Sequence, residues 1–212
     1  MPACDFRLAL ITDRHLSPRP LAEVTDKILA AGVGWVLLRE KDLTEAELMK
    51  LAGTLKSLTE RYGARLIVNS SLPAALATQA YGLHLPFASL EREPEVVKLA
   101  KDKGLRVGVS IHSLEEGRLA LKAEADTLLF GPIAPTKSKP GHPGHGLAVL
   151  RELTKRLAQP LWAVGGLKPD MTREILWAGA TTICLRSSLM TAEDPGSLVA
   201  RFKMALPPES PN

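Results

Sequence analysis

Short runs of apolar residues alternate with segments of helical periodicity along the whole chain. Most of these runs are continuous, as expected of strands that are buried on both faces. Between them, apolar residues recur three and four positions apart, which predicts amphipathic helices. The eight predicted strands are Leu8–Thr12, Trp35–Arg39, Leu66–Asn69, Gly82–Leu85, Val107–Ser110, Thr127–Phe130, Leu161–Val164 and Ile183–Leu185.

Local signals mark the first turns of several helices. Thr44 and Glu47 have the spacing of a capping box, and so do Ser113 and Glu116. A last helix is expected to begin near Pro195. These signals place helices after the predicted strands and support a regular alternation of the two elements.

Eight βα units, of roughly 26 residues each, fill the 212 residues of the chain. Alternating strands and helices predict a parallel sheet. Eight such units predict a single-domain α/β fold, the closed (β/α)8 TIM barrel, near the lower size limit of that fold. A doubly wound open sheet is the alternative. We expect the domain to cover residues 1–206 and a flexible C-terminal tail to cover residues 207–212.

Composition and charge narrow the classes of function. No apolar stretch is long enough to cross a membrane, and the start of the chain lacks the features of a signal peptide, so we expect a cytoplasmic protein. The net charge of +4 suits an anionic ligand. Nucleic acid is not an expected partner, because the basic residues are dispersed and only nine residues are aromatic. Cys4 and Cys184 are too far apart in sequence to indicate a disulfide framework or a zinc site.

Active sites of barrels lie on the loops that follow the strands. Gly165-Gly166 follows the seventh predicted strand and Ser187-Ser188 follows the eighth, a pair of loops that often binds phosphate in this fold. The glycine amides can bind an anion. The alternative is that the two glycines only form a tight turn.

Other strand ends carry cations and polar groups. Arg39 and Lys41 follow the second strand and suit a phosphate or carboxylate, although a solvated charge run is an equal alternative. The long loop after the sixth strand, residues 131–146, favours a functional role over a merely flexible surface loop. His84 lies within a strand and is expected in the core. The remaining candidates, some of which can equally be helix caps, are Asn69, Ser110, His112, Thr136, Ser138, Lys139, His142 and His145.

Together these segments resemble the thiamine phosphate synthase/TenI superfamily over nearly the whole chain. The most specific segments are residues 38–41 (LREK), 108–113 (GVSIHS), 131–139 (GPIAPTKSK) and 163–166 (AVGG). The resemblance implies a TIM barrel that acts in thiamine biosynthesis. In the synthase reaction, a pyrimidine diphosphate loses its diphosphate to give a carbocation, which the nitrogen of a thiazole phosphate then captures.

The resemblance also implies roles for individual residues. Ser110 would lie near the pyrimidine. Gly166 and Ser187 would complete the pocket for the thiazole phosphate, together with the hydroxyls of Thr136 and Ser138. The residues that would hold the diphosphate are Arg39, Lys41, Asn69 and Lys139.

The chain departs from the synthase pattern at the positions that serve magnesium. The two acidic residues of that pattern fall on Ser70 and Ser89 here, and its glutamine two residues before the arginine is Leu37. A magnesium diphosphate would therefore lose its carboxylate anchors, which is a several-kcal/mol effect in metal-assisted chemistry. No metal site and no cofactor are expected, and Mg²⁺ is expected only if synthase activity is retained.

These departures make the TenI branch the leading hypothesis: a protein that binds a thiazole phosphate and tautomerises it by proton transfer. Pro132 stands where the catalytic histidine of that branch lies, so His145, His142 and His112 are candidate proton carriers. A working synthase, with Glu40 or Asp13 replacing the lost ligands, is the first alternative. A non-catalytic regulatory barrel is the second. The family also implies a homo-oligomer, with a dimer favoured.

Overall fold

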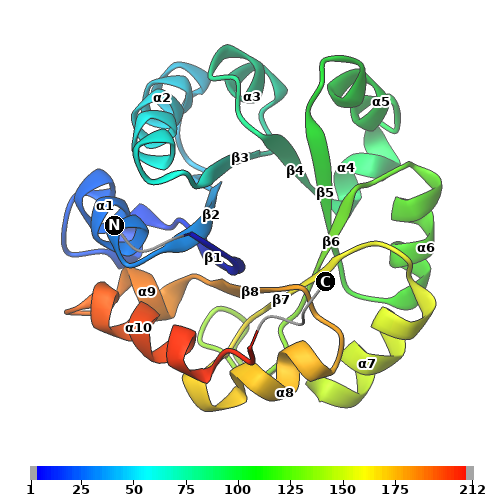
Figure 1. The fold of residues 1–212 in the computed structure, drawn as a ribbon. Helices are drawn as coiled ribbons and strands as arrows, with labels where there is room; N and C mark the ends of the chain where they lie inside the picture. Colours follow the sequence, from blue (N-terminus) through cyan, green and yellow to red (C-terminus); the bar gives the residue numbers. More distant parts are fainter. Residues whose placement is uncertain (1–3, 209–212) are drawn as a thin grey trace.

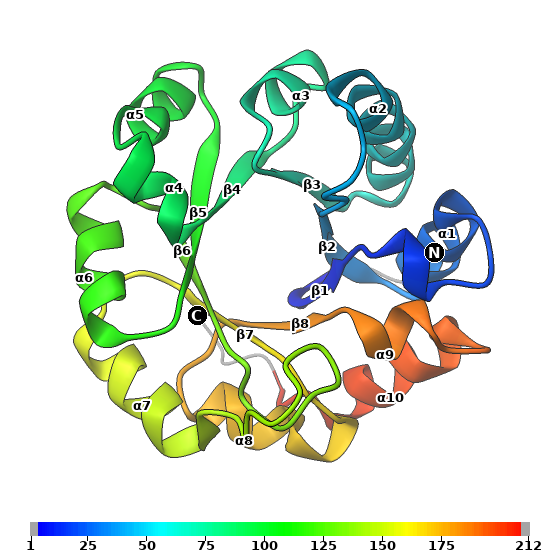
Figure 2. The same ribbon diagram turned by 180° about the vertical axis from the view of Figure 1, so that it is seen from behind.

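The chain forms a closed barrel of eight parallel strands, in the order in which they occur in the sequence (Figures 1 and 2). This computed structural model describes residues 4–208. The predicted (β/α)8 TIM barrel is confirmed, and the open sheet is excluded because β1 pairs with both β2 and β8. The strands are β1 (Asp5–Ile11), β2 (Val33–Leu38), β3 (Arg65–Asn69), β4 (Gly82–Pro86), β5 (Arg106–Ile111), β6 (Thr127–Phe130), β7 (Leu161–Val164) and β8 (Thr182–Leu185).

Helices form the outer ring, as Figure 1 shows, and they bury their apolar faces against the strands. The connection from β4 to β5 holds two helices, two more helices follow β8, and short 3₁₀ turns follow β1 and precede α8. The helical elements are η1 (Arg14–Leu16), α1 (Leu21–Ala30), α2 (Glu45–Tyr62), α3 (Leu72–Ala77), α4 (Phe87–Arg92), α5 (Glu95–Asp102), α6 (Leu114–Lys122), α7 (Gly146–Arg156), η2 (Pro169–Met171), α8 (Thr172–Trp177), α9 (Ser187–Met190) and α10 (Pro195–Ala205).

The hydrophobic interior has two parts, because each strand is buried on both faces. The larger part lies between the strands and the helices and includes Phe130 and Phe202, both fully buried. The smaller part fills the barrel itself. It consists of Ala9, Ile11, Trp35, Leu37, Ile67, Leu129, Trp162 and Cys184. This division explains why the strands appear in the sequence as continuous apolar runs rather than as alternating ones.

The capping signals give one full success and one partial failure. Thr44 and Glu47 form the predicted capping box at α2, with both reciprocal hydrogen bonds present. At α6, the Ser113 hydroxyl accepts from the backbone N–H of Glu116 as predicted. The return bond is absent, because the Glu116 carboxylate instead accepts from the backbone N–H of His112 at 2.7 Å. The predicted second capping box therefore forms only one of its two hydrogen bonds, and the bond from the Ser113 N–H to the Glu116 carboxylate is missing.

Aromatic residues close the barrel at the N-terminal ends of the strands. Trp35 lies at the centre of this cluster, with ring centroids 5.1 Å from Phe6, 5.2 Å from Tyr81 and 5.1 Å from Trp162. The Arg65 guanidinium lies over the rings of Phe6, Trp35 and Tyr81, at 4.4–5.3 Å from their centroids. These contacts are cation–π interactions. The five residues are called the aromatic plug below.

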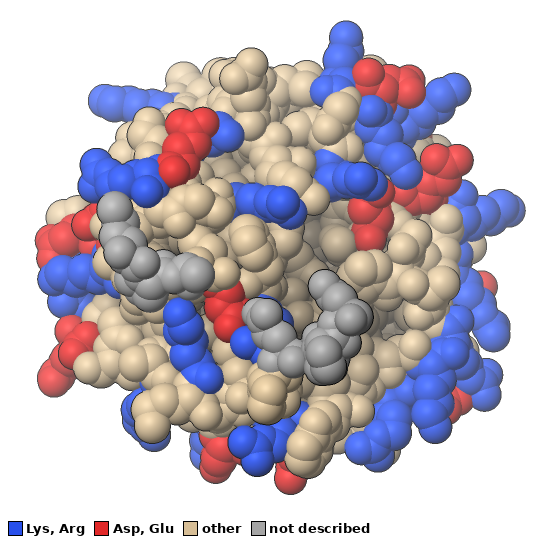
Figure 3. Space-filling model, in the orientation of Figure 1, with Lys and Arg blue, Asp and Glu red and all other residues tan. Residues whose placement is uncertain are grey.

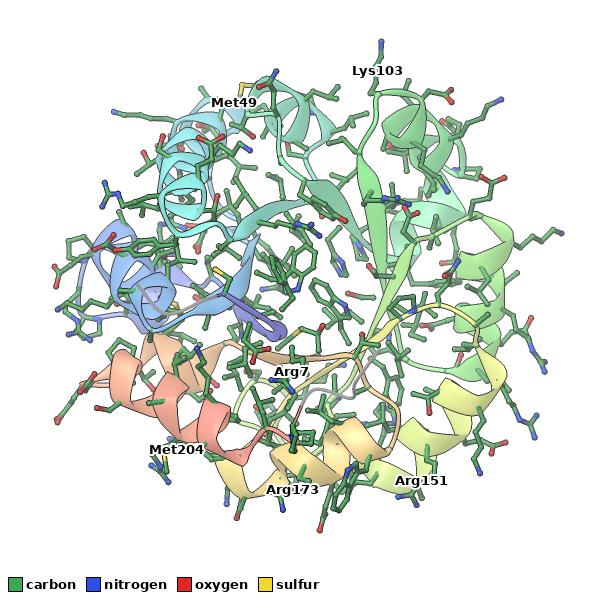
Figure 4. The ribbon with its side chains drawn as sticks, viewed as in Figure 1. Arg7, Met49, Lys103, Arg151, Arg173 and Met204 are labelled. Carbon is green, nitrogen blue, oxygen red and sulfur yellow. The ribbon has the colours of Figure 1, made fainter. Side chains whose placement is uncertain are left out.

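The surface around this end carries mixed charge. In Figure 3, both blue and red side chains lie around the rim of this face, with blue prevailing at the lower right. Arg7, labelled near the barrel axis in Figure 4, donates to the carbonyl of Pro207 at 2.7 Å. The first residue of the predicted tail is thus held in place, while residues 209–212 lie outside the described residues. In residues 4–208, every helix is too short or too polar to span a bilayer.

Candidate functional site

A cavity of about 290 Å³ opens at the C-terminal ends of the strands, the end that faces the viewer in Figure 2. Its floor is apolar and is formed by side chains from inside the barrel. Its upper wall is polar and comes from the strand ends and loops. The polar and glycine residues of the lining are Arg39, Asn69, His84, Ser110, His112, Gly131, Thr136, Ser138, Lys139, Gly165, Gly166, Arg186, Ser187 and Ser188.

The two glycines after β7 are required by close packing and by backbone conformation. Gly165 and Gly166 have φ values of +96° and +70°, which side-chain-bearing residues rarely adopt. A Cβ on Gly166 would lie 2.5 Å from the carbonyl oxygen of Pro135 and 2.6 Å from that of Ala134. The loop after β7 therefore packs directly on the loop after β6, which is how residues of both loops come to line one cavity.

Ser187 and Ser188 are the first two residues of α9, which begins two residues after the end of β8, and both line the cavity. Thr136, in the loop after β6, lines it as well. The structure therefore brings Gly166, Ser187 and Thr136 together, as the phosphate-site interpretation requires. Their role in binding phosphate stays a prediction.

Arg39 is the cation that β2 places in the cavity. Its backbone N–H donates to the hydroxyl of the buried Thr12 at 2.9 Å, which fixes the end of β2 against β1. Burial of the guanidinium lowers the pKa of Arg39, and the positive charge of Arg186 lowers it further. Asn69 ends β3 and donates to the Ser70 hydroxyl at 2.8 Å, so one of its amide hydrogens is already engaged.

Ser110 has a partner that the sequence did not reveal as part of the site. His84 is 5% exposed, as expected of a core residue, yet its Nε2 lies 2.8 Å from the Ser110 Oγ and its ring lines the cavity. Burial lowers the pKa of His84 to about 4, with a smaller contribution from the charge of Arg39. The imidazole is therefore neutral near pH 7. Gly108 makes room for it, because a Cβ there would lie 2.7 Å from the His84 Nδ1.

Of the three predicted proton carriers, only one lines the cavity, although the rings of His142 and His145 lie together at 4.9 Å between centroids. His112 lines the cavity, and its Nδ1 lies 3.3 Å from the Glu116 carboxylate. His142 and His145 do not line it. The ring of His145 packs against buried Phe130 at 4.8 Å between centroids, and the His142 Nδ1 accepts from the backbone N–H of Gly144. Both histidines therefore lie outside the lining of the cavity, although His142 shares a neighbouring hollow with Thr136 and Lys139, and their role in proton transfer stays a prediction.

Lys41 does not line the cavity either and is exposed on the loop after β2. The residue before it, Glu40, is buried and faces η1. Its carboxylate accepts from the backbone N–H of Arg14 at 3.1 Å and pairs with the Arg14 guanidinium at 3.1 Å. The side chain of Arg14 also pairs with Asp42 and holds the pKa of that carboxyl below its usual value. This ion-pair network fixes the loop but leaves Lys41 in solvent.

Arg186 is the functional candidate that sequence reasoning missed. It follows β8 directly, just as Arg39 follows β2, and that position was the available signal. Its guanidinium lines the cavity, donates to the Ser138 hydroxyl and lies 3.8 Å from the Asp13 carboxylate. The side chain is 23% exposed.

The residues around the cavity do not fit a magnesium ion. Mg²⁺ in sites of this kind is held by one or two carboxylates together with substrate phosphates. No Asp or Glu of the described chain lines the cavity, and residues 4–208 contain no group of three His, Cys, Asp or Glu side chains placed to hold a metal. The nearest carboxylates, Asp13 and Glu40, face Arg186 and Arg14. Ser70 and Ser89, at the positions that serve magnesium in the synthase pattern, do not line the cavity.

The fold and the cavity define a class: (β/α)8-barrel proteins with a pocket lined by cations at the C-terminal ends of the strands. A family model described as thiamine monophosphate synthase matches residues 8–189, and the chain belongs to that family.

Individual relatives agree with this assignment. A putative thiamine-phosphate synthase of Geobacter sulfurreducens is 38% identical over 213 residues, which is 99% of each chain. A thiamine-phosphate synthase of Halalkalibacterium halodurans is 35% identical over 192 residues, 90% of each chain. Among solved structures, a thiamine phosphate pyrophosphorylase from Pyrococcus furiosus superposes with a TM-score of 0.82 at 31% identity, covering 94% of this chain and 95% of that one. The chain is thus a thiamine-biosynthesis protein of this superfamily.

Proposed function

We propose that the chain is a thiamine phosphate synthase, which joins a pyrimidine diphosphate to a thiazole phosphate. This reverses the preference given above to the tautomerase, because the relatives that match along most of the chain are named as synthases. One observation carries the proposal. The residues that the family resemblance assigns to the two substrates, all except Lys41, line a single cavity.

The chemistry follows from the arrangement of this lining. In the proposed reaction, the bond between the pyrimidine methylene carbon and the diphosphate oxygen breaks, and its electron pair leaves with the diphosphate. The thiazole nitrogen then donates its lone pair to the carbocation. Arg39 and Lys139 stabilise the charge that develops on the leaving group. Gly166, Ser187 and Thr136 hold the phosphate of the thiazole, and the apolar floor accepts the rings.

A direct assay tests the proposal. Purified protein is incubated with both substrates, with and without Mg²⁺, and thiamine phosphate and inorganic diphosphate are measured. Equal amounts of both products are expected, at a rate above that of buffer. Absence of both products with Mg²⁺ and also without it would reject synthase activity.

A substitution tests the phosphate pocket separately. Ser187→Asp places a carboxylate beside the proposed phosphate, and such like-charge contacts cost several kcal/mol, so we expect affinity for thiazole phosphate to fall by about 100-fold or more. Ser57→Asp, at an exposed position of α2, makes the same change in net charge and should leave the affinity for thiazole phosphate unchanged. Calorimetric titration measures both. Wild-type affinity in Ser187→Asp would contradict the phosphate assignment.

Thiazole tautomerase is the second candidate, and the pair of His84 and Ser110 favours it. A neutral imidazole within hydrogen-bond distance of a hydroxyl can relay a proton, and this pair lies in the cavity wall. Incubation with the thiazole carboxylate tautomer measures this activity, and no acceleration over buffer would exclude it. Tight binding of thiazole phosphate without turnover in either assay would instead identify a non-catalytic binding protein. Assembly into a homodimer stays a prediction, testable by light scattering.

A further inference from the structure

Two arginines line the cavity, and they come from the two strands that neighbour β1 in the closed barrel. Arg39 comes from the end of β2 and Arg186 from the end of β8, the two strands that flank β1. Lys139, from the loop after β6, adds a third cation to the same lining. Three cations without a lining carboxylate form an arrangement that favours a multiply charged anion.

The neighbours of Arg186 hold its guanidinium in the cavity without neutralising the group as a whole. Asp13 lies 3.8 Å away, which is longer than a direct hydrogen bond. The Ser138 hydroxyl accepts from one Nη and leaves the other donors of the guanidinium to a ligand. On the other side, Arg39 is close enough for the two positive charges to disfavour each other. An anion bound between them would relieve this repulsion.

The same part of the site lacks the groups that a metal would need. Ser70 and Ser89 offer hydroxyls where the synthase pattern has carboxylates, and Glu40 is engaged by Arg14. A guanidinium supplies a permanent positive charge and up to five N–H donors, and it grips phosphate oxygens in pairs. In the synthase pattern, carboxylates at the positions of Ser70 and Ser89 serve a magnesium ion. Arg186 can therefore supply to the leaving group the positive charge that the magnesium ion supplies in that pattern.

We propose that Arg186 acts with Arg39 as the cation for the departing diphosphate, so that diphosphate binding and release need no metal ion in this protein. The proposal rests on the synthase function proposed above. As the carbon–oxygen bond breaks, the electron pair moves to the diphosphate oxygen. The guanidinium N–H groups donate hydrogen bonds to that anion, and no proton is transferred.

Binding of inorganic diphosphate tests the role of Arg186 apart from turnover. Titration calorimetry is carried out in a chelator and again with excess Mg²⁺. For the wild type, we expect affinities within about threefold of each other under the two conditions. Because a hydrogen-bonded charged partner contributes roughly 1.5–3 kcal/mol, Arg186→Gln should weaken binding by about 10- to 100-fold, and Arg186→Lys should recover part of the loss.

Arg173→Gln is the matched control. Arg173 lies on α8 in the outer ring, as Figure 4 shows, and its guanidinium faces the exposed Trp177, so removal of its charge should leave diphosphate affinity unchanged. Circular dichroism confirms folding of each variant. Wild-type affinity in Arg186→Gln, or a wild type that binds diphosphate only with Mg²⁺, would overturn the proposal.

The synthase assay separates this proposal from the one on which it rests. Formation of thiamine phosphate in chelator, lost in Arg186→Gln, supports both. Formation of thiamine phosphate only after Mg²⁺ is added leaves the synthase function standing and rejects the role of Arg186. Metal-independent diphosphate binding without any thiamine phosphate rejects the synthase function and keeps Arg186 as an anion-binding residue.

Discussion

The two ends of the barrel use arginine in opposite ways. At the N-terminal end, Arg65 lies over three aromatic rings of the aromatic plug, and the protein itself supplies its partners. At the C-terminal end, Arg39 and Arg186 face a cavity and each other. The first arrangement contributes to stability, because cation–π contacts and buried aromatic surface are favourable within the chain itself. The second places two like charges near each other, which the nearby Asp13 carboxylate offsets in part, so it suits a bound anion.

The largest expected effect comes from a substitution in the aromatic plug, at the N-terminal end of the barrel. Trp35→Ala removes the side chain at the centre of the aromatic plug, which is 9% exposed, and leaves a void in the barrel. Such truncations cost about 3–5 kcal/mol of the free energy of unfolding. Urea denaturation measures the loss, and Trp177→Ala is the control, because Trp177 is 68% exposed and should cost far less. Equal losses in the two variants would deny the plug its stabilising role.

The next largest expected effect is a pH dependence of the free energy of unfolding, which arises from His84 at the C-terminal end of the barrel. The folded-state pKa of His84, about 4, lies below the unfolded value of 6.5, so the unfolded chain takes up a proton that the folded chain does not. The free energy of unfolding should therefore fall as the pH drops from about 6.5 to about 4, by up to roughly 3 kcal/mol from this group. Urea denaturation across this range compares the wild type with His84→Gln, which should show a shallower fall. Parallel curves would show that another group dominates.

The smallest effect compares two glycines. Gly166→Ala should cost about 1–3 kcal/mol, because φ is +70° and the new Cβ meets two carbonyl oxygens. Gly53→Ala in the interior of α2 meets nothing within 4 Å and should stabilise the protein by about 0.5–1 kcal/mol. Thermal unfolding gives both values. A stabilising Gly166→Ala would show that the loops after β6 and β7 are not as tightly packed as described.

The strands could be predicted closely from sequence, and the reason is physical. Each is buried on both faces, so it appears as a continuous apolar run, and β6 and β7 have the predicted bounds. The site was predictable where a residue type suited to anions lies at or just after a strand end, as with Arg39 after β2 and Ser187 two residues after β8. In the long loop after β6, the predicted residues Thr136, Ser138 and Lys139 line the cavity, whereas His142 and His145 lie outside its lining, and no pattern in the sequence separates the two groups.

The other limit on prediction from sequence was competition between alternative hydrogen-bond partners. Nothing in the sequence indicates that the Glu116 carboxylate bonds to the backbone of His112 rather than completing the capping box with Ser113. Likewise, His84 is both a core residue and a site residue, and only the register of β4 against β5 places its ring beside Ser110. Arg186 is a single arginine directly before the pair Ser187-Ser188, and only its position at the strand end marks it in the sequence.

The uncharged imidazole of His84 also imposes a direction on any ligand that enters. Under the synthase function proposed above, the apolar floor takes the aromatic end of a ligand, and the arginines that follow β2 and β8 take its ionic end. Its ionic end then stays next to bulk water. A group released there can diffuse away while the rest of the ligand remains seated, and the barrel does not have to open.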